Sequence, residues 1–179
     1  YVSSDSGVHA IDIATEKQLW SRTLLMPTAP AVGSGTLVVG SRQALVHGLD
    51  SSDGTDRWTV SHGAHWVTGG PVIRTDHVYI GSSDDHRYQS IELATGKVKW
   101  RVGMAANVFS TPAFNEGVSY ISSGNSYADT GNGVVRAVDS EGNILWSFSG
   151  KNFFSSPIAD DNAVFIGSDD GFFYALPAN

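Results

Sequence analysis

The sequence predicts an all-β fold assembled from a repeated four-stranded unit. Short apolar segments alternate with turn residues along the whole chain, no segment keeps a helical period, and two landmarks recur every ~40 residues. The composition agrees, because Gly accounts for 20 of the 179 residues, 11% of the residues are aromatic and only 16% are charged. This composition excludes a disordered chain, a coiled coil and a helical bundle.

The first landmark is a proline that precedes a short apolar strand. Pro30, Pro71, Pro112 and Pro157 lie 41, 41 and 45 residues apart. Ten residues after each proline, a small residue closes a second strand; these residues are Gly40, Gly81, Ser122 and Gly167. We therefore place strands A and B of each unit directly after the proline.

The second landmark is a tryptophan in strand D. An acidic residue that ends strand C stands seven or eight positions before it. The pairs are Asp12 and Trp20, Asp50 and Trp58, Glu92 and Trp100, and Asp139 and Trp146. Gly54, Gly96 and Gly142 stand four positions before the last three tryptophans, where a tight hairpin turn requires a positive φ. The first copy carries Glu16 at this position, so we expect a different turn there.

Strand C carries a small residue two positions before its acidic end, namely Ala10, Gly48, Ser90 or Ala137. A small side chain lets an indole ring lie close to the sheet, and an indole buries roughly 150–250 Å². We therefore predict that each tryptophan packs on this residue and docks neighbouring units. The acidic residues are predicted to accept hydrogen bonds from turn or adjacent-unit backbone, so all four pairs are interpreted as structural.

Four strands in a repeat of ~40 residues are typical of a β-propeller blade. The chain begins on strand B, contains three complete units and ends after strand C, which makes about eighteen strands or four and a half blades. Since an open blade exposes strand edges, we expect an excerpt of a seven- or eight-bladed ring. The predicted limits are 1–26 (partial blade), 27–66, 67–107, 108–152 and 153–179 (partial blade).

The run from Ser90 to Trp100, with weaker copies at Ala10 to Trp20 and Ala137 to Trp146, resembles the tryptophan-docking motif of the pyrroloquinoline quinone (PQQ)-like repeat family. The segment Val164 to Leu176 resembles the strand B to strand C hairpin of that family. The family includes quinoprotein dehydrogenases that bind PQQ and calcium, the cofactor-free assembly scaffold BamB, and sensor domains of bacterial kinases. The resemblance implies a periplasmic or extracellular location.

Two functions remain open at this point. The favoured one is a non-catalytic binding or scaffold module, without a cofactor, that holds a protein partner or a small ligand at the propeller face, as in BamB-like assembly or ligand sensing. The remaining blades of the same propeller are a further expected partner. The alternative is a fragment of a PQQ- and calcium-dependent alcohol or sugar dehydrogenase, although the chain lacks the vicinal cysteine pair that many such enzymes carry.

Several other classes have no support in the sequence. A net charge of −7 gives no reason to expect nucleic acid or an anionic membrane as partner. No apolar run approaches the ~18 residues of a membrane span. No Gly-x-Ser-x-Gly elbow, Walker loop or dinucleotide fingerprint occurs, so no catalytic residue is predicted.

Any ligand site is expected on the face that carries the D-to-A connectors and the B-to-C loops. The tryptophan-to-proline spacings of 10, 13, 12 and 11 show that the connectors vary in length. Strand A is innermost, so the residues before its proline should surround the mouth of the central channel. The predicted ligand-binding residues of this mouth are His65, Trp66, Asn107, Lys151 and Asn152. They suit a planar acidic ligand, and an unoccupied wet funnel is the alternative.

A second candidate set lies in the B-to-C loops and comprises Asp85, His86, Asn125, Tyr127 and Asp129. Metal binding is not predicted for either loop group. His62, His65 and His86 could offer imidazoles to zinc, but no convergent carboxylate accompanies them, and we expect exposed loop histidines. The oxygens of Asn125, Asp129 and Asn132 suit calcium, but their spacing matches no EF-hand loop.

Overall fold

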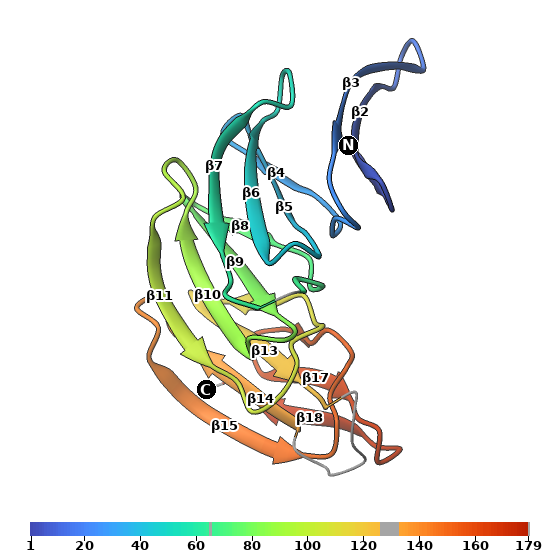
Figure 1. Ribbon diagram of the computed structural model, residues 1–179. Coiled ribbons are helices and arrows are strands. Elements are labelled where there is room, and N and C mark those ends of the chain that lie inside the picture. Colours follow the sequence, from blue (N-terminus) through green and yellow to red (C-terminus); the bar gives the residue numbers. More distant parts are fainter. Residues whose placement is uncertain (65, 126–132, 179) are drawn as a thin grey trace.

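The computed structural model describes residues 1–64, 66–125 and 133–178. These residues form eighteen strands in five antiparallel sheets and no helix. The sheets follow one another along an arc from the N-terminal to the C-terminal end (Figure 1). The predicted all-β propeller of four-stranded blades, with about four and a half blades present, is confirmed.

Three sheets are complete blades of four strands and two are partial. Blade 2 contains β4 (Ala31–Gly33), β5 (Thr36–Gly40), β6 (Leu45–Asp50) and β7 (Asp56–Ser61). Blade 3 contains β8 (Val72–Arg74), β9 (His77–Ser82), β10 (Arg87–Glu92) and β11 (Val98–Gly103). Blade 4 contains β12 (Ala113–Asn115), β13 (Val118–Ser123), β14 (Gly133–Val138) and β15 (Ile144–Gly150). The partial blades are blade 1, with β1 (Val2–Ser4), β2 (Gly7–Asp12) and β3 (Lys17–Thr23), and blade 5, with β16 (Ile158–Ala159), β17 (Ala163–Gly167) and β18 (Phe173–Pro177).

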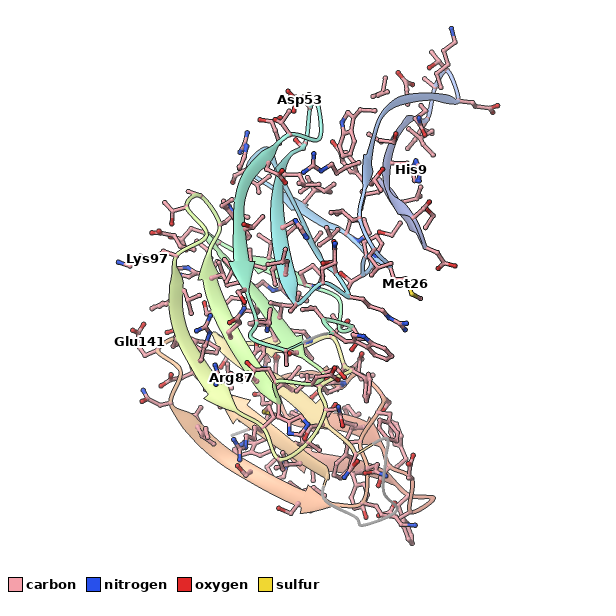
Figure 2. All side chains as sticks on the ribbon, in the orientation of Figure 1. His9, Met26, Asp53, Arg87, Lys97 and Glu141 are labelled. Atoms are coloured by element: carbon pink, nitrogen blue, oxygen red, sulfur yellow. The ribbon has the colours of Figure 1, made fainter. Side chains whose placement is uncertain are left out.

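Within each blade the strands pair in chain order, so every connection between them is a hairpin. This order leaves two faces, one with the D-to-A connectors and B-to-C loops (the connector face) and one with the A-to-B and C-to-D turns (the turn face). In Figure 2, Asp53, Lys97 and Glu141 lie at hairpin tips of the turn face, whereas Met26 lies on the connector side. The described part of the chain contains no helix with the length and hydropathy that a membrane crossing needs.

Each tryptophan lies directly across from the small residue of strand C. The register pairs are Ala10 with Trp20, Gly48 with Trp58, Ser90 with Trp100, and Ala137 with Trp146. A Cβ atom on Gly48 would lie only 2.2 Å from the Trp58 ring, so the ring lies flat against the backbone. The first three indole nitrogens donate to the C-to-D turn of the next blade, at Ser51 O (3.1 Å), Leu93 O (2.8 Å) and Ser140 O (3.0 Å).

The turn glycines are needed less for their positive φ angles than because they let the indole ring of the preceding blade lie close to the turn backbone. A Cβ on Gly54, Gly96 or Gly142 would lie 2.7–2.8 Å from the indole ring of the preceding blade. Glu16, which occupies the same turn position, also has a positive φ, of 57°. The blade 1 turn thus keeps the positive φ without a glycine, but within the described range 1–64 it lacks the bond from this residue's amide to the acidic residue's carbonyl that Gly54, Gly96 and Gly142 make. Among the described residues no indole covers Glu16, so its side chain has room and only the backbone strain remains.

The acidic residues at the end of strand C hold their own turns. The Asp12 carboxylate accepts hydrogen bonds from the backbone of Ala14 (2.9 Å) and Thr15 (3.0 Å). The Asp139 carboxylate accepts them from Glu141 (2.9 Å) and Asn143 (2.8 Å). A hydrogen bond from the Asn143 side chain (2.9 Å), together with these backbone bonds, lowers the pKa of Asp139. The carboxylates act locally in the turn, whereas the indoles connect one blade to the next.

The hydrophobic core is divided into clusters that lie between blades. One cluster joins Val38, Val60 and Trp58 of blade 2 to Ile80 and Ile91 of blade 3. Packing of this kind makes each blade depend on its neighbours, as in other repeat architectures.

Candidate functional site

Backbone hydrogen bonds hold the D-to-A connectors against the loops of the following blade. The residue five positions before each strand A proline accepts the bond at its carbonyl oxygen. The pairs are Arg42 N to Leu25 O (3.1 Å), Ser83 N to Trp66 O (3.0 Å), Gly124 N to Asn107 O (3.0 Å) and Asp169 N to Asn152 O (3.1 Å). Among the predicted mouth residues, the backbones of Trp66, Asn107 and Asn152 are therefore tied to the next blade.

The next residue along each connector returns to its own blade. The amides of Val67, Val108 and Phe153 donate to the carbonyl oxygens of Ser41 (3.2 Å), Ser82 (3.4 Å) and Ser123 (3.2 Å). These three side chains are buried. A Cβ on Gly40 would lie 2.3 Å from Val67, and one on Gly81 would lie 2.2 Å from Val108. The small residue that ends strand B thus makes room for the connector, a role that sequence reasoning missed.

Asn107 and Asn152 are buried, and both side chains are bonded within the fold. The Asn107 amide group donates to Ser83 O (3.1 Å) and to Ser83 Oγ (3.2 Å). The Asn152 side-chain oxygen accepts from the amide of Asn125 (2.8 Å). These asparagines hold B-to-C loops in place, and their burial, with 3% and 5% of their surface exposed, leaves little of either side chain at the mouth.

Trp66 is the predicted mouth residue that presents a large apolar surface, with 36% of it exposed. The Arg42 guanidinium lies over the Trp66 ring, 4.1 Å from the ring centre, which is a cation–π geometry. We call this pair the Arg42–Trp66 platform. A groove of about 340 Å³ adjoins it, lined by Ser3, Ser4, Asp5, Met26, Pro27, Thr28, Arg42, Val67 and Thr68.

Sequence reasoning missed Arg42, although a signal was present. Arg42 stands two residues after the small residue that ends strand B, and the equivalent positions carry Ser83, Gly124 and Asp169. Arg42 is the arginine among the four residues at this position of the repeat, and the connector of its blade carries a tryptophan. Together these two residues could have indicated the platform.

The other predicted residues are dispersed. Asp85 pairs with Arg87 (3.1 Å) in the B-to-C loop of blade 3, and the neighbouring His86 has a positive φ of 47°. Lys151 is half-buried beside Asn152. His65, Tyr127 and Asp129 lie outside the described residues, as does Asn132 of the calcium candidate. Among the described residues, no three His, Cys, Asp or Glu side chains are grouped as metal ligands would be.

His62 is buried, contrary to the expectation of an exposed loop histidine. Its Nε2 lies 2.8 Å from the Gln89 side-chain nitrogen, and Gln89 Oε1 accepts from Arg101 Nε at 2.9 Å. Burial, together with the positive charges of Arg101 and Arg87, lowers the pKa of His62 to about 4. The Gln89 amide donates to the ring, so His62 is a neutral residue of the interface between blades 2 and 3.

Known proteins resemble the chain in sequence. The outer membrane protein assembly factor BamB of Yersinia pestis is 25% identical over 159 residues, which cover 79% of this chain and 38% of that protein. The serine/threonine-protein kinase AfsK of Streptomyces griseus is 28% identical over 157 residues, covering 80% of this chain and 19% of the kinase. The chain therefore spans only part of the length of these relatives.

Solved structures share the fold. Quinohemoprotein alcohol dehydrogenase of Comamonas testosteroni matches 98% of this chain and 39% of its own, with a TM-score of 0.78 and 18% identity. BamB of Moraxella catarrhalis matches 97% of this chain and 65% of its own, with a TM-score of 0.60 and 17% identity. At these identities the likeness concerns the propeller fold alone.

A family profile described as outer membrane protein assembly factor BamB matches residues 4–113. The matched part contains blades 1 to 3, apart from the first residues of β1, with the docking tryptophans Trp20, Trp58 and Trp100. Since it exceeds half of the 179 residues, the chain is a PQQ-like repeat β-propeller that belongs to the BamB family.

Proposed function

We propose that this propeller is a non-catalytic binding module that scaffolds a partner protein through the Arg42–Trp66 platform. The observation that carries the proposal is the exposed indole with a guanidinium stacked on it at 4.1 Å, beside a groove on a rigid face. Tryptophan and arginine dominate the binding energy of many protein interfaces because they offer a large contact area and directed donors. Family membership supports a role in protein assembly and a periplasmic or extracellular location.

Replacement of the platform residues should weaken partner binding with little effect on folding. A photoreactive amino acid at Thr68, in the adjoining groove, should capture a protein partner in cells of the source organism, and W66A and R42M should each reduce the capture about tenfold or more. K97M on the turn face is the control. Unchanged capture in both platform variants would contradict the proposal.

The alternative of a PQQ dehydrogenase requires residues that can hold a planar quinone at the mouth. The residues predicted for this task do not fit it, since the Asn107 and Asn152 side chains are buried and Arg42 covers one face of the Trp66 ring. We expect PQQ with calcium to leave the thermal unfolding temperature unchanged; a saturable increase would favour the dehydrogenase.

The predicted blade limits and the completion of the ring remain proposals. Phe173, the first residue of β18 in blade 5, is 70% exposed. The equivalent residues Val46, Tyr88 and Val135 pair with the same strand B position and are completely buried. The exposed phenylalanine supports our expectation that another blade of the same propeller covers this surface.

A further inference from the structure

A second groove lies on the turn face, between blades 3 and 4, and has a volume of about 540 Å³. It is formed by the β8–β9 turn, β11 and the β12–β13 turn. Its lining residues are Arg74, Thr75, Asp76, His77, Tyr79, Lys99, Phe114, Asn115, Glu116, Gly117 and Ser140. A groove of this volume can accept a few residues of a peptide.

Aromatic rings from both blades line this groove. Tyr79 of blade 3 and Phe114 of blade 4 meet edge to face, with ring centres 4.8 Å apart. Tyr79 belongs to the hydrophobic cluster between the two blades, and Phe114 packs against that cluster. This packing restrains both rings; Tyr79 is 8% exposed and forms the floor of the groove, whereas the half-buried Phe114 offers most of the apolar surface to an incoming side chain.

Arg74 is the basic side chain of the groove that lacks a carboxylate partner among the described residues. Lys99 pairs with Glu141 (2.8 Å), and His77 pairs with Asp76 (2.6 Å). The Arg74 guanidinium lies 5.3 Å from the centre of the Phe114 ring. Stacking on the ring leaves the N–H edges of the guanidinium available, and these edges match the two oxygens of a carboxylate.

We propose that this groove binds a polypeptide segment in which a carboxylate side chain is followed by an apolar one. The carboxylate pairs with Arg74, and the apolar side chain packs on Tyr79 and Phe114. A monoanionic carboxylate suits the site better than a phosphate dianion, since Arg74 is a single unpaired cation and Glu116 also lines the groove. The proposal is independent of the Arg42–Trp66 platform, which lies on the other face.

The test uses fluorescence anisotropy with a fluorescein-labelled peptide of alternating Glu and Leu, capped at both ends. Binding by the full chain should weaken about tenfold or more in R74M, which loses a charge-assisted hydrogen bond. E116Q should bind the peptide more tightly, because a repelling carboxylate is removed. K17M, at an exposed lysine of β3 in blade 1 that lines neither groove, is the control and should bind like the unchanged protein. Identical thermal unfolding temperatures would show that the variants are folded.

Three results would overturn this proposal: unchanged binding in R74M, loss of binding in K17M but not in R74M, or equal binding of a peptide with Gln in place of Glu. The last result would assign the groove to apolar segments without charge selection. Because capture from Thr68 depends on Arg42 and peptide binding depends on Arg74, failure of one proposal is distinguishable from failure of the other.

Discussion

Replacement of Trp58 by alanine is expected to lower the free energy of unfolding by about 3–5 kcal/mol. Trp58 is 8% exposed and packs in the cluster between blades 2 and 3. Its ring lies against Gly48 on one side and Gly96 of the next blade on the other. The variant would leave a cavity there and would deprive Leu93 O of its indole donor at 2.8 Å. Urea denaturation measures the loss.

Trp66→Ala is the matched control for this prediction. Trp66 is 36% exposed and its ring contacts Arg42, so its removal should change the free energy of unfolding by less than about 1 kcal/mol. W58F should recover part of the stability, since a phenyl ring fills part of the space but donates no hydrogen bond. Equal destabilisation by W58A and W66A would mean that the blades are not docked through the indole.

Acidification is expected to destabilise the protein through His62. Burial, with the charges of Arg101 and Arg87, lowers the pKa of His62 from 6.5 to about 4. As the pH falls below 6.5, the unfolded chain takes up the proton before the folded chain does. The stability that depends on a neutral His62 is therefore present above pH 6.5 and is lost progressively towards pH 4, by up to about 3 kcal/mol.

His62→Gln is the variant that isolates this effect, because glutamine is neutral throughout this range and can still bond to Gln89. Urea unfolding at a series of pH values should show that the free energy of unfolding falls less steeply with acidification in H62Q than in the unchanged protein. The free energy of unfolding of H62Q should still fall slightly at low pH, since burial also lowers the pKa of His47. Parallel curves for the two proteins would exclude His62 as the source.

The repeat pattern was sufficient to predict the fold. The spacing of Pro30, Pro71 and Pro112 reports a unit length, and the pairing of a small residue with a tryptophan is local to one hairpin. The repeat length is visible because the same motif recurs along the chain, and the hairpin pairing is visible because it joins residues that are close in sequence. The candidate site was harder to predict, because burial at the connector face depends on contacts with other loops. Asn107 and Trp66 occupy equivalent positions, yet the first is buried and the second is partly exposed.

By itself the sequence determined the blade architecture, the strand count and the positions of the docking tryptophans, because period and turn chemistry are properties of adjacent residues. Only the tertiary structure decided which polar side chains form hydrogen bonds within the fold and which are accessible to a ligand or partner. Arg42 meets Trp66, and Arg74 meets Phe114, across 24 and 40 residues of chain. Arg74 meets Phe114 only because blades 3 and 4 pack side by side, and Arg42 meets Trp66 only because the connector after β7 folds back towards the β5–β6 loop, so no local pattern in the sequence contains either contact.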